Sequence, residues 1–86
     1  METIKMKEDS ILDKTIDYSG PDSTLMISPA ALDDVMANTD PMMWDFDGQR
    51  RLYRGAFVEV HDEWSWGWNV RNRDDEIIHL PKRYAP

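Results

Sequence analysis

Short stretches in which apolar and polar residues alternate predict that much of this chain forms β-strands. Residues 3–7 place Ile4 and Met6 on one face, as expected of a strand. Residues 11–18 are rich in β-branched side chains and predict a second strand, although Leu12 breaks the alternation.

One helix is predicted, at residues 28–38, directly after a short apolar run. Ser28 can cap its N-terminus, and Pro29 suits the first helical position. We expect Asn38 to end it in a left-handed conformation. Its narrow apolar stripe consists of Leu32, Val35 and Met36, and its two aspartates point away from that stripe.

From residue 42 onward the pattern is that of a β-meander. Residues 52–61 and residues 64–70 each predict a strand, and a turn at residues 71–75 leads to a third strand at residues 76–80. The first of these strands has one apolar face, formed by Ala56, Val58 and Val60.

The pattern predicts a single α+β domain that is mainly β. Residues 1–41 supply N-terminal strands and one short helix, and residues 42–86 supply the meander. A chain of 86 residues, 41% hydrophobic and 31% charged, has room for one core. Because the chain contains no cysteine, a disulfide, a thiol nucleophile and a thiolate metal site are excluded.

The formal net charge is −7, and it is concentrated in the first half. Residues 1–48 hold eleven acids against three lysines, whereas residues 49–86 hold six acids against seven bases. An acidic protein repels nucleic acids and anionic membranes and attracts a basic partner. We therefore expect an acidic partner-binding surface, although solvated loops also collect aspartate. Its candidate residues are Asp13, Asp17, Asp22, Asp33, Asp34, Asp40, Asp45 and Asp47.

The N-terminal residues and the hydropathy indicate where the protein acts. Charged residues stand where a signal peptide would need its apolar stretch, and no apolar run approaches the length of a membrane span. We expect a cytoplasmic protein without a membrane partner.

Hydrolytic and transfer enzymes need an activated nucleophile or a paired acid and base, and the sequence shows neither. It has two histidines and five serines without triad spacing. His61, Asp62 and Glu63 cannot converge on a metal within a strand, because neighbouring side chains point to opposite faces unless a turn intervenes. Residues 45–48 resemble a calcium loop only faintly, since position 54 is Arg and not Glu. We expect no enzymatic activity, no metal and no cofactor.

Three tryptophans at alternate positions are the most informative feature of the sequence. Trp64, Trp66 and Trp68 would share one face of the predicted strand. In one interpretation, Trp66 and Trp68 fill the core of a short chain. In the other, at least one of the three forms an exposed binding platform with Trp44 and Tyr84.

Two short motifs lie one after the other in residues 42–86. Trp64-Ser65-Trp66-Gly67 corresponds to a Trp-Trp-x-Gly/Ala strand, and Leu80-Pro81-Lys82-Arg83-Tyr84 corresponds to an aliphatic-Pro-x-x-Tyr close. With a Gly-led strand at residues 55–60 and the opening Met42-Met43-Trp44-Asp45-Phe46, residues 42–86 resemble the SH3 domain. The resemblance implies a small antiparallel barrel with an aromatic groove for proline-rich peptides. Its groove positions are Trp44, Phe46, Trp64, Pro81 and Tyr84.

These features lead to three functional hypotheses. The first is a non-catalytic inhibitor that occupies a basic, nucleic-acid-binding surface of a partner protein. In size and charge the chain is similar to small acidic phage inhibitors such as anti-CRISPR and anti-restriction proteins. The alternative is an SH3-like adaptor for an extended or proline-rich peptide. The third is nucleic-acid binding by the bases of the second half, which six interleaved acids oppose. These bases are Arg50, Arg51, Arg54, Arg71, Arg73, Lys82 and Arg83.

Overall fold

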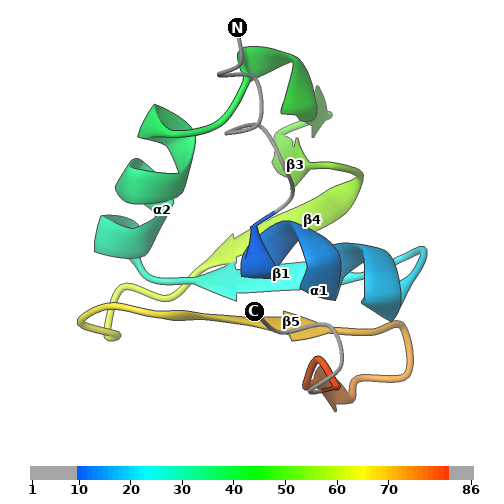
Figure 1. Cartoon of the computed structure of the whole chain (residues 1–86). Helices are drawn as coiled ribbons and strands as arrows, with labels where there is room; N and C mark the ends of the chain where they lie inside the picture. Colours follow the sequence, from blue (N-terminus) through cyan, green and yellow to red (C-terminus); the bar gives the residue numbers. More distant parts are fainter. Residues whose placement is uncertain (1–9, 82–86) are drawn as a thin grey trace, which may run out of the picture.

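The computed structural model describes residues 10–81, which form two helices and a six-stranded sheet (Figure 1). The helical elements are α1 (Ile11–Ser19), α2 (Pro29–Ala37) and the 3-10 turn η2 (Pro41–Met43). The strands are β1 (Thr24–Ile27), β2 (Trp44–Asp47), β3 (Arg50–Tyr53), β4 (Ala56–Val60), β5 (Trp68–Arg71) and β6 (Ile77–Ile78). The α+β class is confirmed, with helix and strand in similar proportions where a mainly β domain was expected. The strand predicted at residues 3–7 lies outside the described residues.

Helix α1 occupies the residues for which the sequence predicted a second strand, so that prediction is wrong. A capping box begins the helix: Asp13 N–H donates to Ser10 Oγ at 3.2 Å, and Ser10 N–H donates to the Asp13 carboxylate at 3.4 Å. Leu12 and Ile16 are both buried. Because they lie four residues apart, the position that interrupted the strand alternation belongs to the apolar face of the helix.

The helix predicted at residues 28–38 is confirmed as α2. Ser28 is its N-cap, with Oγ accepting from Ala31 N–H at 3.2 Å, and Pro29 occupies the first turn. Asn38 ends the helix, but with φ of −111° and not in the expected left-handed conformation. Its side chain instead donates to the Asp34 carbonyl oxygen at 2.8 Å, which satisfies one of the last free carbonyls.

The sheet is open and mixed, so the expected antiparallel barrel is wrong. Its strand order is β2-β3-β4-β1-β5-β6, in which β1 pairs parallel with β4 and antiparallel with β5. A strand from the first half of the chain therefore interrupts the meander predicted for residues 42–86. The parallel pair is possible because α2 and the β2–β3 hairpin form the long connection that such pairing requires.

The strand predicted at residues 52–61 is two strands, β3 and β4, joined by a tight turn. Arg54 and Gly55 have positive φ values of 51° and 86°. A type I′ hairpin turn requires positive φ at both central residues, and asparagine or glycine usually occupies them. The turn was missed because arginine is rare in this conformation.

The two remaining predicted strands are shorter than expected. The strand predicted at residues 64–70 is confirmed only from Trp68, because the preceding residues form a loop. Gly67 holds the end of this loop to α2: Ser28 N–H donates to the Gly67 carbonyl at 2.9 Å, and Gly67 N–H donates to Ser28 Oγ at 3.1 Å. The strand predicted at residues 76–80 is reduced to β6.

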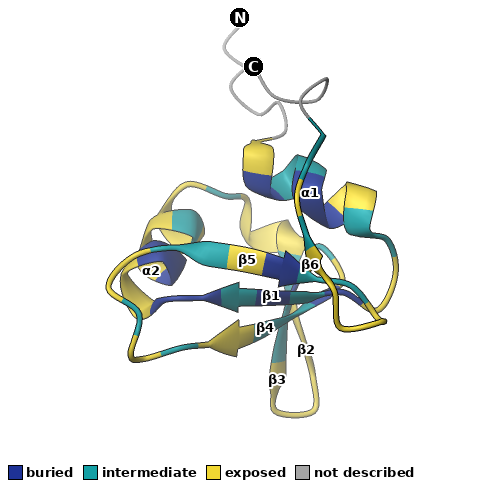
Figure 2. Cartoon of the chain, turned by 90° about the horizontal axis from the view of Figure 1, so that it is seen from below, coloured by how far each residue is buried: buried dark blue, intermediate teal, exposed yellow. Residues whose placement is uncertain are grey.

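Both helices cover the same face of the sheet, as Figures 1 and 2 show. Residues 25, 58 and 70 are paired across β4, β1 and β5, so their side chains point to this face. The buried core comprises Leu12, Ile16, Leu25, Ile27, Ala31, Leu32, Tyr53, Ala56 and Val70. Val35, Trp44, Val58 and Trp68 pack against it. The opposite face is not covered by any described helix.

Candidate functional site

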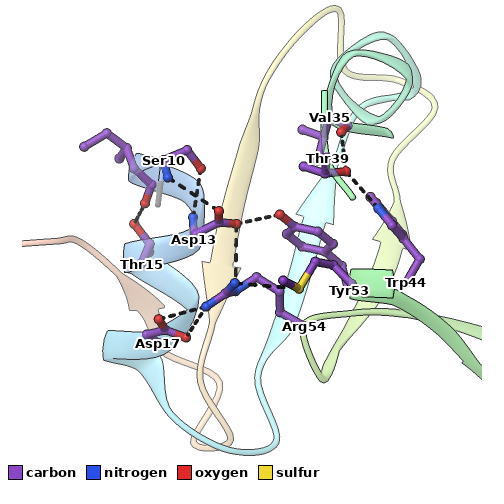
Figure 3. Close-up of polar contacts among 11 residues, drawn as sticks. Ser10, Asp13, Thr15, Asp17, Val35, Thr39, Trp44, Tyr53 and Arg54 are labelled. Carbon is purple, nitrogen blue, oxygen red and sulfur yellow. Dashed lines mark hydrogen bonds and ion pairs between the residues drawn. The ribbon is translucent and has the colours of Figure 1, made fainter. Parts of the chain in front are cut away.

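Two of the candidate acidic residues are held in an internal network beside the β3–β4 turn (Figure 3). Tyr53 Oη donates to Asp13 Oδ1 at 2.6 Å, and Arg54 Nε lies 3.9 Å from the same oxygen. Arg54 Nη2 donates to both carboxylate oxygens of Asp17, at 3.0 and 3.2 Å. The left-handed Arg54 thus joins its hairpin to α1. Asp17 is therefore paired with Arg54, and Asp13 accepts from Tyr53 with the same guanidinium nearby.

Five other candidate acids are exposed on consecutive elements and form no ion pair within residues 10–81. We call them the acidic rim: Asp33 and Asp34 on α2, Asp40 at the start of η2, and Asp45 and Asp47 on β2. No lysine or arginine occurs between Lys14 and Arg50, and Arg50, which lies opposite Asp47 across β2 and β3, has its guanidinium over the Phe57 ring. The eighth candidate, Asp22, is exposed in the turn before β1 with a φ of 61°.

The rim carboxylates make only local hydrogen bonds. Asp40 Oδ1 accepts from Met42 N–H at 2.9 Å and so caps η2. Asp34 Oδ1 accepts from the Asn38 side chain at 3.3 Å, and Asp45 Oδ1 accepts from the following backbone N–H. Neutral donors of this kind leave each negative charge uncompensated, with carboxylate oxygen still available to an external cation.

Most bases of the second half are already engaged within the domain. Arg71 lies 3.8 Å from Glu59 and 3.4 Å from Asp75. The Arg50 guanidinium lies 3.8 Å from the centre of the Phe57 ring. Arg51 contacts the sulfur of Met36 at 3.4 Å and lies 5.8 Å from the centre of the Phe46 ring. Arg73 is exposed in the turn after β5, and Lys82 and Arg83 lie outside the described residues.

The expected SH3 groove positions are spread over separate elements. Trp44 and Phe46 lie on the edge strand β2, where Trp44 Nε1 donates to Thr39 Oγ1 at 2.9 Å. Phe46 is 61% exposed. Trp64 lies in the loop after β4, and Pro81 lies at the end of the described residues. Tyr84 lies outside them.

The three alternating tryptophans have three different environments. Trp64 stacks on His61 with ring centres 4.4 Å apart, Trp66 is 60% exposed in the same loop, and Trp68 packs against the core from β5. They do not share one strand face, because only Trp68 lies on a strand. Trp68 therefore contributes to the core, as one interpretation expected, whereas Trp66 is exposed.

His61 lies just after β4, between the carboxylates of Glu59 and Glu63, which are two residues before and two residues after it. His61 Nε2 lies 2.9 Å from Glu59 and Nδ1 lies 3.5 Å from Glu63. The hydrogen bond to Glu59 is the main reason that the pKa of His61 is raised above 6.5. The pKa of Glu63 is lowered, first by a backbone hydrogen bond and then by His61. Within residues 10–81, no group of three such ligands is arranged to hold a metal ion.

A half-open groove of about 510 Å³ lies between the two helices, the β3–β4 turn and the tryptophan loop. Its apolar lining comprises Ile11, Leu12, Val35, Met43, Trp66 and Trp68. Among residues 10–81, three carboxylates, Asp13, Asp34 and Asp40, also line it, and Arg54 is the one cation. The sequence did not predict this groove, because its walls come from four segments and one of them was assigned to a strand. Several groove residues were candidates from the sequence, namely Asp13, Asp34, Asp40, Trp66 and Trp68, but no sequence pattern placed them together.

The chain matches no protein-family model, no curated protein and no solved structure. Across residues 10–81, neither helix is long and apolar enough to cross a membrane.

Proposed function

We propose that this chain is a non-catalytic protein-binding domain that occupies a basic surface of a partner protein. Where that surface normally binds nucleic acid, the domain acts as an inhibitor by taking the place of phosphates. One observation carries the proposal: the acidic rim is exposed and lacks ion pairs among the described residues, whereas Asp13 and Asp17 are paired internally.

Charge repulsion within the rim supports this proposal. Like charges on neighbouring elements destabilise a folded domain, and a nearby lysine or arginine would relieve that cost. No lysine or arginine of residues 10–81 forms an ion pair with the rim, although Arg50 lies opposite Asp47 across β2 and β3. A basic partner would supply the missing positive charge and would be steered toward the rim at long range.

The arrangement of the bases argues against direct nucleic-acid binding. Arg54 and Arg71 are paired with carboxylates, and Arg50 lies over an aromatic ring. Phosphate binding would have to break these contacts and overcome the net charge of −7.

The test is affinity capture with the full chain at low and high salt, followed by competition with duplex DNA or RNA. The rim variant is Asp33→Asn with Asp47→Asn. Its matched control, Asp62→Asn with Asp74→Asn, removes the same charge from exposed residues elsewhere. We expect a basic partner that is released by salt and by nucleic acid, and that the rim variant binds severalfold more weakly than the control. Binding that is indifferent to salt, or equal for both variants, would refute the proposal.

A further inference from the structure

We propose that the groove is a docking site for one kind of segment: a lysine or arginine next to a large apolar side chain, presented by the partner protein. This inference rests on the proposed function, because it specifies where and how the basic partner is recognised. In this arrangement the apolar side chain enters the groove. The neighbouring basic side chain lies along Trp66 and directs its charge toward the carboxylates of the rim.

The groove has the composition of a site for an apolar anchor. Its apolar walls come from both helices, η2 and the tryptophan loop, so a side chain in it would be enclosed on several sides. Trp68 and Leu12 also contact or belong to the core, which makes the floor rigid. A volume of about 510 Å³ exceeds that of any single side chain and suits a short segment.

Trp66 supplies the anchor on this chain. It lines the groove and is nevertheless 60% exposed, which is unusual for the largest apolar side chain in a small domain. The next residue, Gly67, is fixed to Ser28 by two hydrogen bonds, so the loop is tied to α2 immediately beside Trp66. Exposed tryptophans held in this way are typical interface anchors, and their ring faces attract cations.

The charge of the groove selects a basic segment over an acidic or neutral one. Arg54 is bound by Asp13 and Asp17, so it offers little attraction to an incoming anion. Asp34 and Asp40 line the groove without a cationic partner among residues 10–81. A lysine or arginine head would meet these two carboxylates, whereas a carboxylate on the incoming segment would be repelled.

The experiment selects a random peptide library on the immobilised full chain, with counter-selection on the bare support. Surviving peptides should share a lysine or arginine next to a large apolar residue. One such peptide is then titrated against the wild type, Trp66→Ala, and the matched variant Trp64→Ala, whose ring stacks on His61 and does not line the groove. We expect Trp66→Ala to weaken binding about tenfold and Trp64→Ala to change it by less than about twofold.

Asp34→Asn with Asp40→Asn should weaken binding of the same peptide and flatten its salt dependence. Peptides that lack basic residues, or that do not depend on Trp66, would overturn the inference. So would a dimer that Trp66→Ala dissociates in sedimentation, since a second copy would then be the occupant. An increase in peptide affinity on Ile4→Ser would also overturn it, by assigning the groove to the chain's own N-terminal residues.

This inference and the proposed function can fail separately. If selected basic peptides bind Trp66→Ala normally but lose affinity for the rim variant Asp33→Asn with Asp47→Asn, the groove is not used and the proposed function stands. If the partner captured with the full chain binds equally well at low and high salt while the peptides still require Trp66, the proposed function fails and the groove inference stands.

Discussion

Two groups of aspartates in this domain have different surroundings. Beside the β3–β4 turn, Asp13 and Asp17 surround Arg54, and Asp13 also accepts from the buried Tyr53 hydroxyl. From α2 to β2, the five aspartates of the rim are exposed, with no ion pair among the described residues. The first group therefore joins a helix to a hairpin, whereas the second makes only local hydrogen bonds among the described residues and keeps its negative charge uncompensated.

The contrast shows why a list of acids from the sequence cannot define an interaction surface. All eight candidates were equivalent as sequence positions, and the structure separates them by whether an ion pair is formed within residues 10–81. A structural aspartate should be costly to remove and irrelevant to salt-dependent binding. A rim aspartate should behave in the opposite way.

The largest effect that separates the two groups is expected for Asp13→Ala compared with Asp33→Ala. Asp13→Ala removes the capping box and the acceptor of the buried Tyr53 hydroxyl, and should lower the free energy of unfolding by about 3 kcal/mol. Asp33→Ala should change it by less than about 0.5 kcal/mol. Urea denaturation of both variants measures the difference. Equal losses would show that the two groups are not distinct.

A smaller effect is expected at Arg54. Arg54→Ala should cost roughly 2 kcal/mol, because the partly buried Asp13 carboxylate loses its cation. Arg54→Gly loses the same contacts but relieves the positive φ of 51°, so it should be more stable than Arg54→Ala by about 1 kcal/mol. If the glycine variant is the less stable of the two, the turn does not have the left-handed conformation described here.

The smallest effect concerns His61, whose charge compensates Glu59 and Glu63 only when the ring is protonated. Because the pKa of His61 is raised in the folded state, its stabilising contribution is fully present below the ordinary value of 6.5. It is lost as the pH rises through the raised folded-state pKa. The difference in Tm between the wild type and His61→Gln should therefore shrink as the pH is increased above 6.5. A difference that is constant or grows with pH would contradict this assignment.

Local signals in the sequence predicted α2 but not α1, although both helices have caps. At α2, the Ser28-Pro29 pair precedes a helical apolar stripe, and no competing pattern is present. At α1, Ser10 and Asp13 form an equally good cap, but Ile11, Thr15 and Ile16 suggested a strand. The tertiary burial of Leu12 and Ile16 decides between the two, and that burial depends on contacts distant in sequence.

The sheet order and the groove could not be obtained from local pattern. Pairing β1 between β4 and β5 depends on long-range contacts that no turn residue signals. The groove requires α1, α2, the Arg54 turn and Trp66 to meet, so an error in any one element hides it. The SH3 resemblance rested on short motifs, and the open sheet shows that such motifs occur outside a barrel.

We propose that the rim, and not the acids around Arg54, binds the positively charged groups of a partner. The most direct measurement is a ¹H–¹⁵N NMR titration of the full chain with a short oligolysine. We expect chemical-shift changes of amide resonances to concentrate in residues 33–47 and to disappear at high salt. The amide resonances of Asp13 and Asp17 should not shift. Shifts centred on those two residues, or spread evenly over every acid of the chain, would contradict this proposal.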